Sequence, residues 1–477
     1  MTETAKKKRG MPSSFTILLA LLAIVAVITV IVSGTSGGAV TAARLSDFCT
    51  APILGFADAL PVCLFVMILG GFLGMMTETG ALDNGIAVLV QKLKGNEIML
   101  IPVLMLIFSL GGTTYGMCEE TVPFYALLAA TMMAAGFDPM VGAATVLLGA
   151  GTGVLGSTIN PFATGAAVAA ATSVGVEVNM GTTYVIGIIL WLSAYLLSVL
   201  FVTAYAKKVR ANKGSILTAA QLDECQKAYG GKDVTTAKLT GRQKAVLWLF
   251  ALSFVVMILG FIPWGSLSET MYNAFSSSTT WLTGACLGDW WFYDAATWFL
   301  LMGIIIGIVG LEDKGQLMKL IANGFSDMVS VNLVIAMARA TSVIMAATGL
   351  GTWLVEASVT ALSQSGVSAG VFALLDYILH VGLSFLVPSS SGLAGLSAPI
   401  VSPIVAGMGW SVETSIMINV AANGFVNLFT PTCGFIMGGL ALARVPYESW
   451  LKWAWKLLLT LFVVVGVVLT IAMAVLS

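Results

Sequence analysis

Two stretches of the chain follow one pattern, GGTTYGMCEETVP at residues 111–123 and VPSSSGLAGLSAP at residues 387–399. Each combines glycine, hydroxyl side chains and proline, and each lies between strongly apolar arms. When the stretches are laid over each other, Gly116 falls on Gly392. Irregular backbone at membrane depth is tolerated only where it is buried in protein or lines a polar cavity. The pattern therefore predicts two re-entrant hairpins.

Each stretch is followed by a second interruption, GVLGSTINP at residues 153–161 and GFVNLFTPTCG at residues 424–434. Glycine lets the backbone turn sharply, and proline removes an N–H group and stops a helix, so both interruptions predict broken helices. A repeated pair of interrupted apolar segments is a sequence pointer to the binding site of a secondary transporter. We expect all four interruptions to meet around one polar pocket midway through the lipid.

The composition is that of an integral membrane protein. Of 477 residues, 58% are hydrophobic and 9% are charged, whereas soluble domains carry about 25% charged residues. Five apolar runs are long enough to span a bilayer, at residues 15–32, 60–76, 182–205, 245–262 and 453–476. We predict an all-α fold with about nine to eleven spans. The first run is too long for a signal peptide and is interpreted as a retained helix.

Basic residues mark the cytoplasmic side of a membrane protein. They concentrate at residues 6–9 and in the hydrophilic stretch 207–244. If the hairpins re-enter rather than cross, only Arg44 is external and only Arg339 lies within a span. We therefore predict a multi-pass protein of the bacterial cytoplasmic (inner) membrane, in contact with the lipid bilayer and with a cytoplasmic N-terminus.

The stretch 207–244 is a predicted cytoplasmic loop that divides the chain into two halves. The predicted repeats and their hairpins are residues 1–206 with a hairpin near 98–136, and residues 245–477 with a hairpin near 370–408. The first hairpin enters from inside and the second from outside, so the halves form an inverted repeat, the symmetry of alternating-access carriers. The second half is expected to hold one additional span near residues 331–350.

Polar residues at the interruptions are the candidate substrate-binding set. An opened helix exposes N–H groups that attract carboxylates, and carbonyls that, with hydroxyls, suit a hard cation such as sodium. The candidates are Thr113, Thr114, Glu119, Glu120, Ser157, Thr158, Asn160, Ser389, Ser390, Ser391, Asn423, Asn427, Thr430 and Thr432. A sodium ion is placed at Thr113, Ser157, Ser390 and Thr430. The alternative is that these small polar residues only join packed helices.

Adjacent acids, Glu119 and Glu120, stand at the turn of the first hairpin. Carboxylates inside a membrane are costly unless they are paired, protonated or in contact with water, and like charges this close favour a shared proton. If the turn is buried, the acids suit a guanidinium, an ammonium or protons. In the alternative, the turn reaches the cytoplasmic surface and the glutamates are solvated.

Asp376 and His380 are one helical turn apart, so both project from one helix face. Arg339, mid-span, needs a carboxylate, for which Asp376 and Glu356 are candidates. A structural salt bridge is the favoured interpretation, and ion coupling by Asp376 and His380 is the alternative. The asparagines at 419, 423 and 427 form a stripe that either lines the substrate path or hydrogen-bonds between helices.

Several functional classes lack their usual residues. The chain has one histidine and six cysteines, the latter without metal or disulfide spacing, and no phosphate-binding GxxxxGK[ST] loop. We expect buried free thiols, and a protein that is not an enzyme, uses no cofactor and binds no nucleic acid. A channel would require a continuous pore and stays as a minor alternative.

The quoted motifs resemble those of the ion-transporter superfamily, and most closely of the anaerobic C4-dicarboxylate-carrier-like (YfcC-like) family, which includes basic amino-acid exchangers. The resemblance rests on GGTTYGMCEETVPF, GSTINPFAT, PSSSGLAGLSAP and NLFTPT. It implies inverted repeats, each with a re-entrant hairpin and an unwound helix, and a transport domain that moves against a dimerising scaffold. Superfamily members with sodium sites carry a Ser-Asn-Thr triplet at each tip. Here the tips read GTT at 112–114 and SSS at 389–391, without asparagine.

The substrate prediction follows from the charges at the interruptions. They hold two glutamates and no lysine or arginine, which is unexpected for a doubly anionic substrate. Helix termini can bind one carboxylate, and the glutamates can bind a distal cation. We therefore predict an antiporter of basic amino acids (arginine, ornithine or lysine) by alternating access. The alternative is sodium- or proton-coupled transport of C4-dicarboxylates or other small metabolites.

Overall fold

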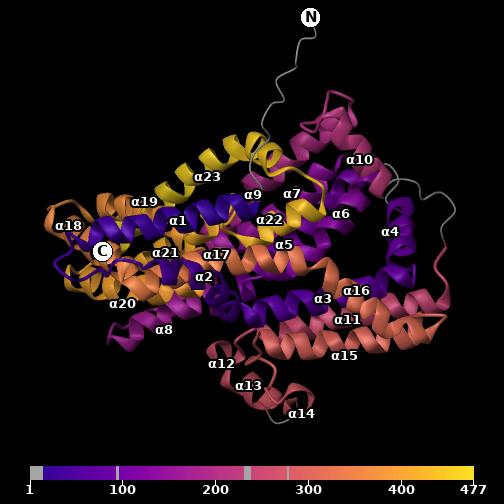
Figure 1. Ribbon diagram of the computed structural model, residues 1–477, viewed down its shortest axis with the longest axis horizontal. Coiled ribbons are helices and arrows are strands. Elements are labelled where there is room, and N and C mark those ends of the chain that lie inside the picture. The colour runs from indigo at the N-terminus through magenta and orange to yellow at the C-terminus, as the bar shows by residue number, and fades with distance from the viewer. Residues whose placement is uncertain (1–13, 93–95, 230–237, 277–278) are drawn as a thin grey trace, which may run out of the picture.

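The computed structural model describes residues 14–92, 96–229, 238–276 and 279–477, and this part of the chain is helical without strands (Figure 1). Ten of the described helices are long and apolar enough to cross a membrane by length and composition. All five apolar runs predicted from the sequence lie in helices, except that Ile262 follows the end of α11. The basic residues 6–9 and residues 230–237 of the hydrophilic stretch 207–244, which were used to orient the chain, lie outside the described residues.

The first half contains nine helices before the hydrophilic loop. They are α1 (Ser14–Ser33), α2 (Leu45–Asp58), α3 (Leu60–Glu78), α4 (Ala81–Lys92), α5 (Leu100–Tyr115), α6 (Val122–Ala134), α7 (Pro139–Leu155), α8 (Ala166–Ser173) and α9 (Met180–Arg210). A short helix, α10 (Ala219–Tyr229), lies in the loop. Single turns occupy Glu97–Met99, Glu119–Thr121 and Pro161–Gly165, the last of them a π-helical turn.

The described part of the second half begins with two long helices that flank three short ones. In order they are α11 (Gly241–Phe261), α12 (Trp264–Leu267), α13 (Glu269–Ser276), α14 (Thr280–Thr283) and α15 (Phe292–Gly310). After a turn at Lys314–Gln316 come α16 (Leu317–Asp327), α17 (Val329–Thr348), α18 (Leu350–Gln364), α19 (Ala369–Leu386), α20 (Ser390–Gly407), α21 (Val412–Val426), α22 (Gly434–Leu442) and α23 (Tyr447–Leu476).

The two halves repeat the same order of elements in opposite orientation. Helices α5 and α6 form hairpin 1, and α19 and α20 form hairpin 2; each hairpin is followed by a broken helix, α7–α8 or α21–α22. Helix packing is reciprocal, because α2 contacts α17 while α3 contacts α16, and α6 contacts α22 while α20 contacts α8. The predicted all-α fold with inverted repeats, re-entrant hairpins and broken helices is confirmed.

The unmatched helix is not the one expected. A span near residues 331–350 was predicted to be the extra element, but it is α17, the counterpart of α3 by the reciprocal packing. The element without a partner is α11, which packs against α15. The sequence did not show this, because only the run at residues 60–76 was counted as a span, and α2, which precedes α3 with Ala59 alone between them, was not counted.

The contacts divide most of the helices into two groups. Helices α1, α2, α3, α11, α15, α16 and α17 pack mainly on one another, and we name them the scaffold group. The two hairpins, the two broken helices, α9 and α23 form the hairpin group. The groups meet chiefly where α17 packs against α22.

Glycine makes the turn of hairpin 1 possible. Gly116 follows α5 with φ +82°, a left-handed conformation that non-glycine residues adopt at a cost. A Cβ at Gly116 would also lie 2.7 Å from Oδ1 of Asn160 in the first broken helix. This residue therefore holds the hairpin tip against the break in α7–α8.

Two prolines at matching positions of the sequence repeat occupy different places in their helices. Pro123 lies in the first turn of α6, where the missing N–H group costs little. Pro399, its partner in the sequence repeat, lies inside α20, as does Pro403. Neighbouring helices stabilise a proline-containing helix in a membrane protein, and α20 packs against α8, α18 and α21.

Candidate functional site

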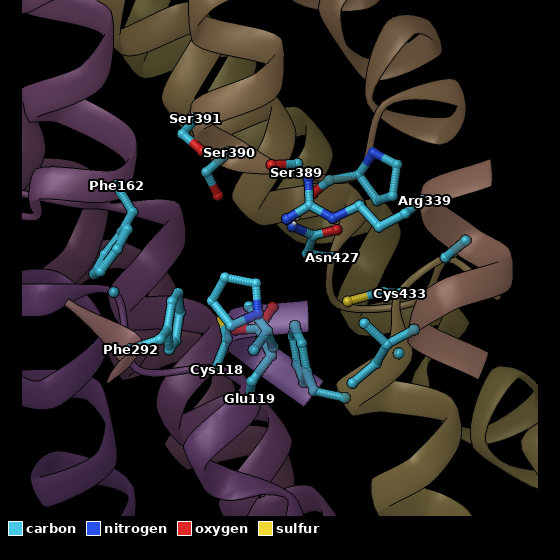
Figure 2. A pocket seen from close by; sticks show the side chains of 18 of the residues that line it. Cys118, Glu119, Phe162, Phe292, Arg339, Ser389, Ser390, Ser391, Asn427 and Cys433 are labelled. Carbon is cyan, nitrogen blue, oxygen red and sulfur yellow. Dashed lines mark hydrogen bonds between the residues drawn. The ribbon is translucent and has the colours of Figure 1, made fainter. Parts of the chain in front are cut away.

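One cavity of about 280 Å³ lies where the four interruptions meet (Figure 2). The hairpin group contributes Gly116, Cys118, Glu119, Asn160, Phe162, Pro388, Ser389, Ser390, Ser391, Asn427, Thr432, Cys433, Gly434 and Phe435. Both hairpin tips and both helix breaks are represented. The prediction that the four interruptions surround a common cavity is confirmed, and the cavity is the candidate substrate site.

The scaffold group closes the other side of this cavity. It contributes Asp58, Pro61, Val62, Trp291, Phe292, Ile335, Ala338 and Arg339. The cavity therefore lies between the two helix groups rather than inside either. None of these scaffold residues was in the predicted site. Only Arg339 had been noted from the sequence, as a charged residue within a span that needs a carboxylate partner.

A charged pair from the scaffold group faces the cavity. Nη1 of Arg339 lies 3.6 Å from Oδ2 of Asp58, and Figure 2 shows the guanidinium extending toward Ser389 and Asn427. The expectation that Arg339 would pair with Asp376 or Glu356 is wrong. Asp58 was missed because it is far from Arg339 in the sequence. It reaches Arg339 only because α2, which ends at Asp58, packs against α17. The absence of basic residues from the interruptions thus does not leave the cavity without positive charge.

The adjacent glutamates of hairpin 1 have different surroundings. Glu119 lines the cavity and is half-buried. Glu120 is 2% exposed, and its Oε2 accepts a hydrogen bond from the backbone N–H of Cys118 at 3.0 Å. The chain therefore presents one carboxylate to the cavity from this turn and uses the other to hold the turn's own backbone.

Hydroxyls at the first break join backbone segments. Oγ1 of Thr113 donates to the carbonyl of Gly156 at 2.8 Å, while the N–H and hydroxyl of Thr158 donate to the carbonyl of Thr113 at 2.8 and 2.9 Å. Oγ of Ser157 donates to the carbonyl of Val154. The two threonines tie α5 to the break in α7–α8, while Ser157 bonds within α7 and its break. None of the three is among the residues that line the cavity in the described chain.

Asn160 is the exception at this break. It lines the cavity, and its Nδ2 donates to Oγ of Ser157 at 2.8 Å. Its Oδ1 accepts from the N–H groups of Phe162 and Ala163, which begin the next helical segment. Asn160 thus caps a half-helix whose N-terminus faces the cavity. Thr114, at the end of α5, instead donates to the carbonyl of Leu110.

Amide side chains organise the second break. Nδ2 of Asn423 donates to the carbonyl of Pro388 at 3.2 Å, and Nδ2 of Asn427 donates to the same carbonyl at 3.0 Å. Oδ1 of Asn423 accepts from Ser390 and from Asn427, each at 2.9 Å. Oδ1 of Asn427 is buried without a hydrogen-bond partner, although Asn427 lines the cavity. Buried polar atoms normally have a partner, so this oxygen is an unsatisfied hydrogen-bond acceptor at the cavity.

Hairpin 2 and the second break also supply helix N-termini. Ser389 caps α20 by accepting from the N–H of Gly392 at 3.2 Å, and α22 begins at Gly434. Ser389, Ser390, Ser391 and Gly434 all line the cavity. Helix N-termini carry partial positive charge and bind anions. The second half thus presents positive poles where hairpin 1 presents a carboxylate.

The four residues predicted to hold sodium divide between the two halves. Thr113 and Ser157 have first-half partners, whereas Ser390 is bonded to Asn423, and Oγ1 of Thr430 lies 2.7 Å from Oγ1 of Thr432. Of the four, only Ser390 lines the cavity. No group of three or more His, Cys, Asp or Glu residues that could hold a metal ion occurs in the described chain.

The predicted ion-coupling residues lie outside this cavity. Asp376 and His380 are buried in α19, with Nδ1 of His380 3.0 Å from Oδ1 of Asp376. Asn419 donates to the carbonyl of Leu393 in hairpin 2. The described cysteines are unpaired and buried, except that Cys49 is exposed.

Comparison with known proteins gives the chain relatives over most of its length. A protein of Haemophilus influenzae Rd is 28% identical over 91% of this chain and 79% of its own. The "Putative basic amino acid antiporter YfcC" of Escherichia coli K12 is 28% identical over 87% of this chain and 77% of its own. The crystal structure of the Alcanivorax borkumensis YdaH transporter, 16% identical, aligns with a TM-score of 0.48 over 96% of this chain and 98% of that one.

The family model described as the C4-dicarboxylate anaerobic carrier, DcuC, matches residues 41–474. This match covers both hairpins, both broken helices and the cavity between them. The chain is therefore a multi-pass membrane protein that belongs to the C4-dicarboxylate anaerobic carrier (DcuC) family of secondary transporters.

Proposed function

We propose that this carrier exchanges basic amino acids, such as arginine, ornithine and lysine, across the bacterial cytoplasmic membrane. The observation that carries the proposal is the cavity's combination of Glu119 with Arg339 and several helix N-termini. One side suits a cation and the other a carboxylate. A basic amino acid carries both groups, separated by an aliphatic chain.

The carboxylate end of the substrate is assigned to Arg339 and to the second break. Arg339 offers a planar fork of donors that matches a carboxylate, and α20 and α22 begin at the cavity wall. The unpartnered Oδ1 of Asn427 is an acceptor, so it suits the substrate's α-ammonium group. These groups define an amino-acid recognition end.

The side-chain end is assigned to Glu119 and the aromatic wall. Phe162, Trp291 and Phe292 line the same cavity, and the rings of Phe162 and Trp291 lie 4.5 Å apart between centroids. Aromatic faces attract guanidinium and ammonium groups. A cavity of about 280 Å³ lies near the lower end of small-molecule sites, roughly 300–1,000 Å³, which favours a single small solute.

Alternating access follows from the position of the cavity between the helix groups. Movement of the hairpin group against the scaffold group would carry Glu119 and the second break past Arg339 and Asp58. We assign no enzymatic step to this cycle. We further propose a homodimer with a cytoplasmic N-terminus, as the family resemblance and the basic loop 207–244 suggest. Lys207, Lys208 and Arg210 end α9 where that loop begins.

A C4-dicarboxylate is the second candidate substrate. The matching family is described by that substrate, and Arg339 with the helix N-termini gives the cavity anion-binding groups. Against it stands Glu119, whose charge would repel one end of a dicarboxylate.

Counterflow in proteoliposomes tests the choice. Labelled arginine should accumulate only in vesicles loaded with arginine, ornithine or lysine, and not in vesicles loaded with succinate. Exchange driven by internal succinate, with labelled succinate entering and arginine inactive, would replace the basic amino acid by the dicarboxylate.

A further inference from the structure

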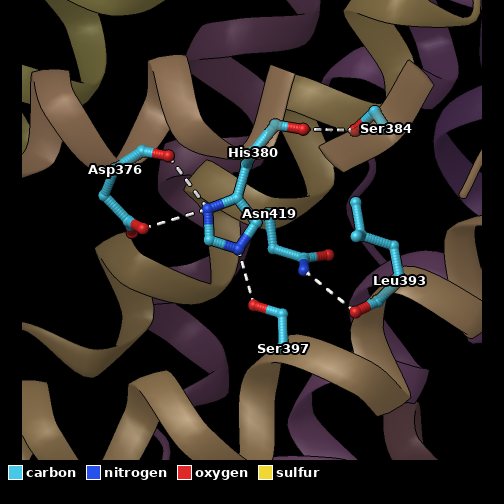
Figure 3. Close-up of polar contacts among 6 residues, drawn as sticks. All are labelled: Asp376, His380, Ser384, Leu393, Ser397 and Asn419. Carbon is cyan, nitrogen blue, oxygen red and sulfur yellow. Dashed lines mark hydrogen bonds and ion pairs between the residues drawn. The ribbon is translucent and has the colours of Figure 1, made fainter. Parts of the chain in front are cut away.

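Hairpin 2 encloses a buried acid–base pair that is separate from the substrate cavity (Figure 3). Asp376 and His380 lie on α19 and are 0% and 1% exposed. Nδ1 of His380 lies 3.0 Å from Oδ1 of Asp376 and 2.9 Å from that residue's backbone carbonyl. Nε2 lies 2.5 Å from Oγ of Ser397 on α20, the other arm of the hairpin.

The partners of the imidazole determine which nitrogen exchanges a proton. The backbone carbonyl beside Nδ1 can only accept a hydrogen bond, so Nδ1 carries hydrogen in both charge states. The hydroxyl of Ser397 beside Nε2 can either donate or accept. It therefore donates to neutral His380 and accepts from protonated His380. The site satisfies both states, and Nε2 is the atom that gains or loses the proton.

Charge balance makes the proton necessary when the hairpin is closed. Apart from His380, neither carboxylate oxygen of Asp376 has a hydrogen-bond partner. With neutral His380, an ionised Asp376 would leave an uncompensated buried negative charge, which is costly in a membrane protein. One added proton on Nε2 gives an imidazolium–carboxylate pair with no net charge.

Charges on neighbouring helices do not compensate the pair. The charged residues on helices packed against α19 and α20 are Glu356 on α18, Glu413 on α21, and Glu448, Lys452 and Lys456 on α23. Glu448 is paired with Lys452, and Glu413 accepts from Asn179 and Ser411. Glu356 is exposed. No ion pair in the described chain joins any of them to Asp376 or His380.

The pair connects the two arms whose tip binds substrate in the function proposed above. His380 is on one arm and Ser397 on the other, while Asn419 from α21 donates to Leu393 between them. The tip residues Ser389–Ser391 line the substrate cavity. They lie about nine residues beyond His380, roughly 14 Å along a helix. A change of charge at Asp376 and His380 is therefore expected to change the distance between α19 and α20, the two arms that carry the tip.

We infer that Asp376 and His380 form a proton-binding site that couples transport to proton movement. This inference rests on the proposed exchange function and adds to it a coupled ion. The proton enters from water onto Nε2 when the arms separate, Ser397 changes from donor to acceptor, and the neutral pair is enclosed when the arms close. Release on the opposite side reverses these steps.

Proton flux and exchange can be measured separately in proteoliposomes that contain a pH-sensitive dye. Net arginine uptake by the wild type should move protons, whereas arginine–arginine counterflow needs no net proton movement. His380→Gln and Asp376→Asn should lower the proton flux per arginine at least tenfold and leave counterflow within about threefold. Ser384→Ala is the matched control, because Ser384 donates to the backbone carbonyl of His380 and leaves the imidazole in place.

The outcomes distinguish this inference from the proposed function. An unchanged proton flux per arginine in both variants, or parallel loss of counterflow in folded protein, would overturn the proton site. Failure of wild-type arginine counterflow would instead overturn the proposed substrate. An independent check uses the chain's single histidine: selectively ¹⁵N-labelled protein in lipid discs should show Nε2 of His380 titrating, and a signal constant from pH 5 to 9 would contradict the inference.

Discussion

The two helix breaks share a sequence pattern but differ in what they present to the cavity. At hairpin 1 and the first break, the hydroxyls of Thr113, Ser157 and Thr158 donate to backbone carbonyls. The charged group that this half presents to the cavity is the carboxylate of Glu119 at the hairpin tip. In the second half, the cavity is lined by the hydroxyl-rich tip 389–391 of hairpin 2 and by the amide of Asn427 at the second break. The inverted repeat therefore duplicates the backbone and not the chemistry. A symmetric pair of hairpins can recognise a substrate whose two ends differ.

The largest expected effect tests the acidic character of the first break. Glu119→Gln should lower kcat/KM for arginine counterflow about 100-fold, because it removes the charged partner of the substrate's cation. Glu120→Gln is the matched control; it faces the N–H of Cys118 and should change kcat/KM much less. Equal effects, or a larger effect of Glu120→Gln, would contradict the division of roles between the two glutamates.

The next prediction tests the contact between hairpin 1 and its break. Gly116→Ala should lower the Tm and reduce transport about 30-fold, because it adds strain at positive φ and a collision with Asn160. Gly136→Ala separates these causes, since Gly136 has φ +84° with no atom within 4 Å of its Cβ position. It should lower the Tm less and spare transport. Equal losses would mean that strain alone matters and that the Asn160 contact does not position the tip.

A smaller effect is expected from the amide of the second break. Asn427→Ala should raise the KM for arginine about tenfold, since its free acceptor contacts the substrate. Thr158→Val removes a hydroxyl whose partners are the carbonyl and the hydroxyl of Thr113. It should lower the Tm and leave KM unchanged. If Thr158→Val raises KM as much as Asn427→Ala does, the proposal that only the second break contacts the substrate through this kind of side chain is contradicted.

The smallest effect concerns the scaffold side. Arg339→Lys keeps the positive charge but loses the planar fork, so KM should rise only about threefold. Arg339→Gln should raise it further, because it also leaves Asp58 without its partner. Initial rates across a range of arginine concentrations measure both changes. If Arg339→Gln has the same KM for arginine as the wild type, Arg339 does not contact the substrate.

Local chemistry in the sequence was sufficient for the fold class and the position of the interruptions. Apolar runs must become spanning helices in lipid, and a cluster of glycine, hydroxyls and proline disrupts a helix wherever it occurs. The glutamates at 119 and 120 and the asparagines at 423 and 427 could therefore be identified as site candidates before folding was known.

Only the tertiary structure decided which of those residues reach the cavity and what joins them there. Asp58 and Arg339 are far apart in the sequence and meet because α2 packs against α17. Adjacent side chains such as Glu119 and Glu120 diverge because the turn between α5 and α6 directs one into the cavity and the other toward its own backbone. Sequence determines where a helix must break, since that depends on neighbouring residues. Contacts between separate helices determine which atoms the break presents to a substrate.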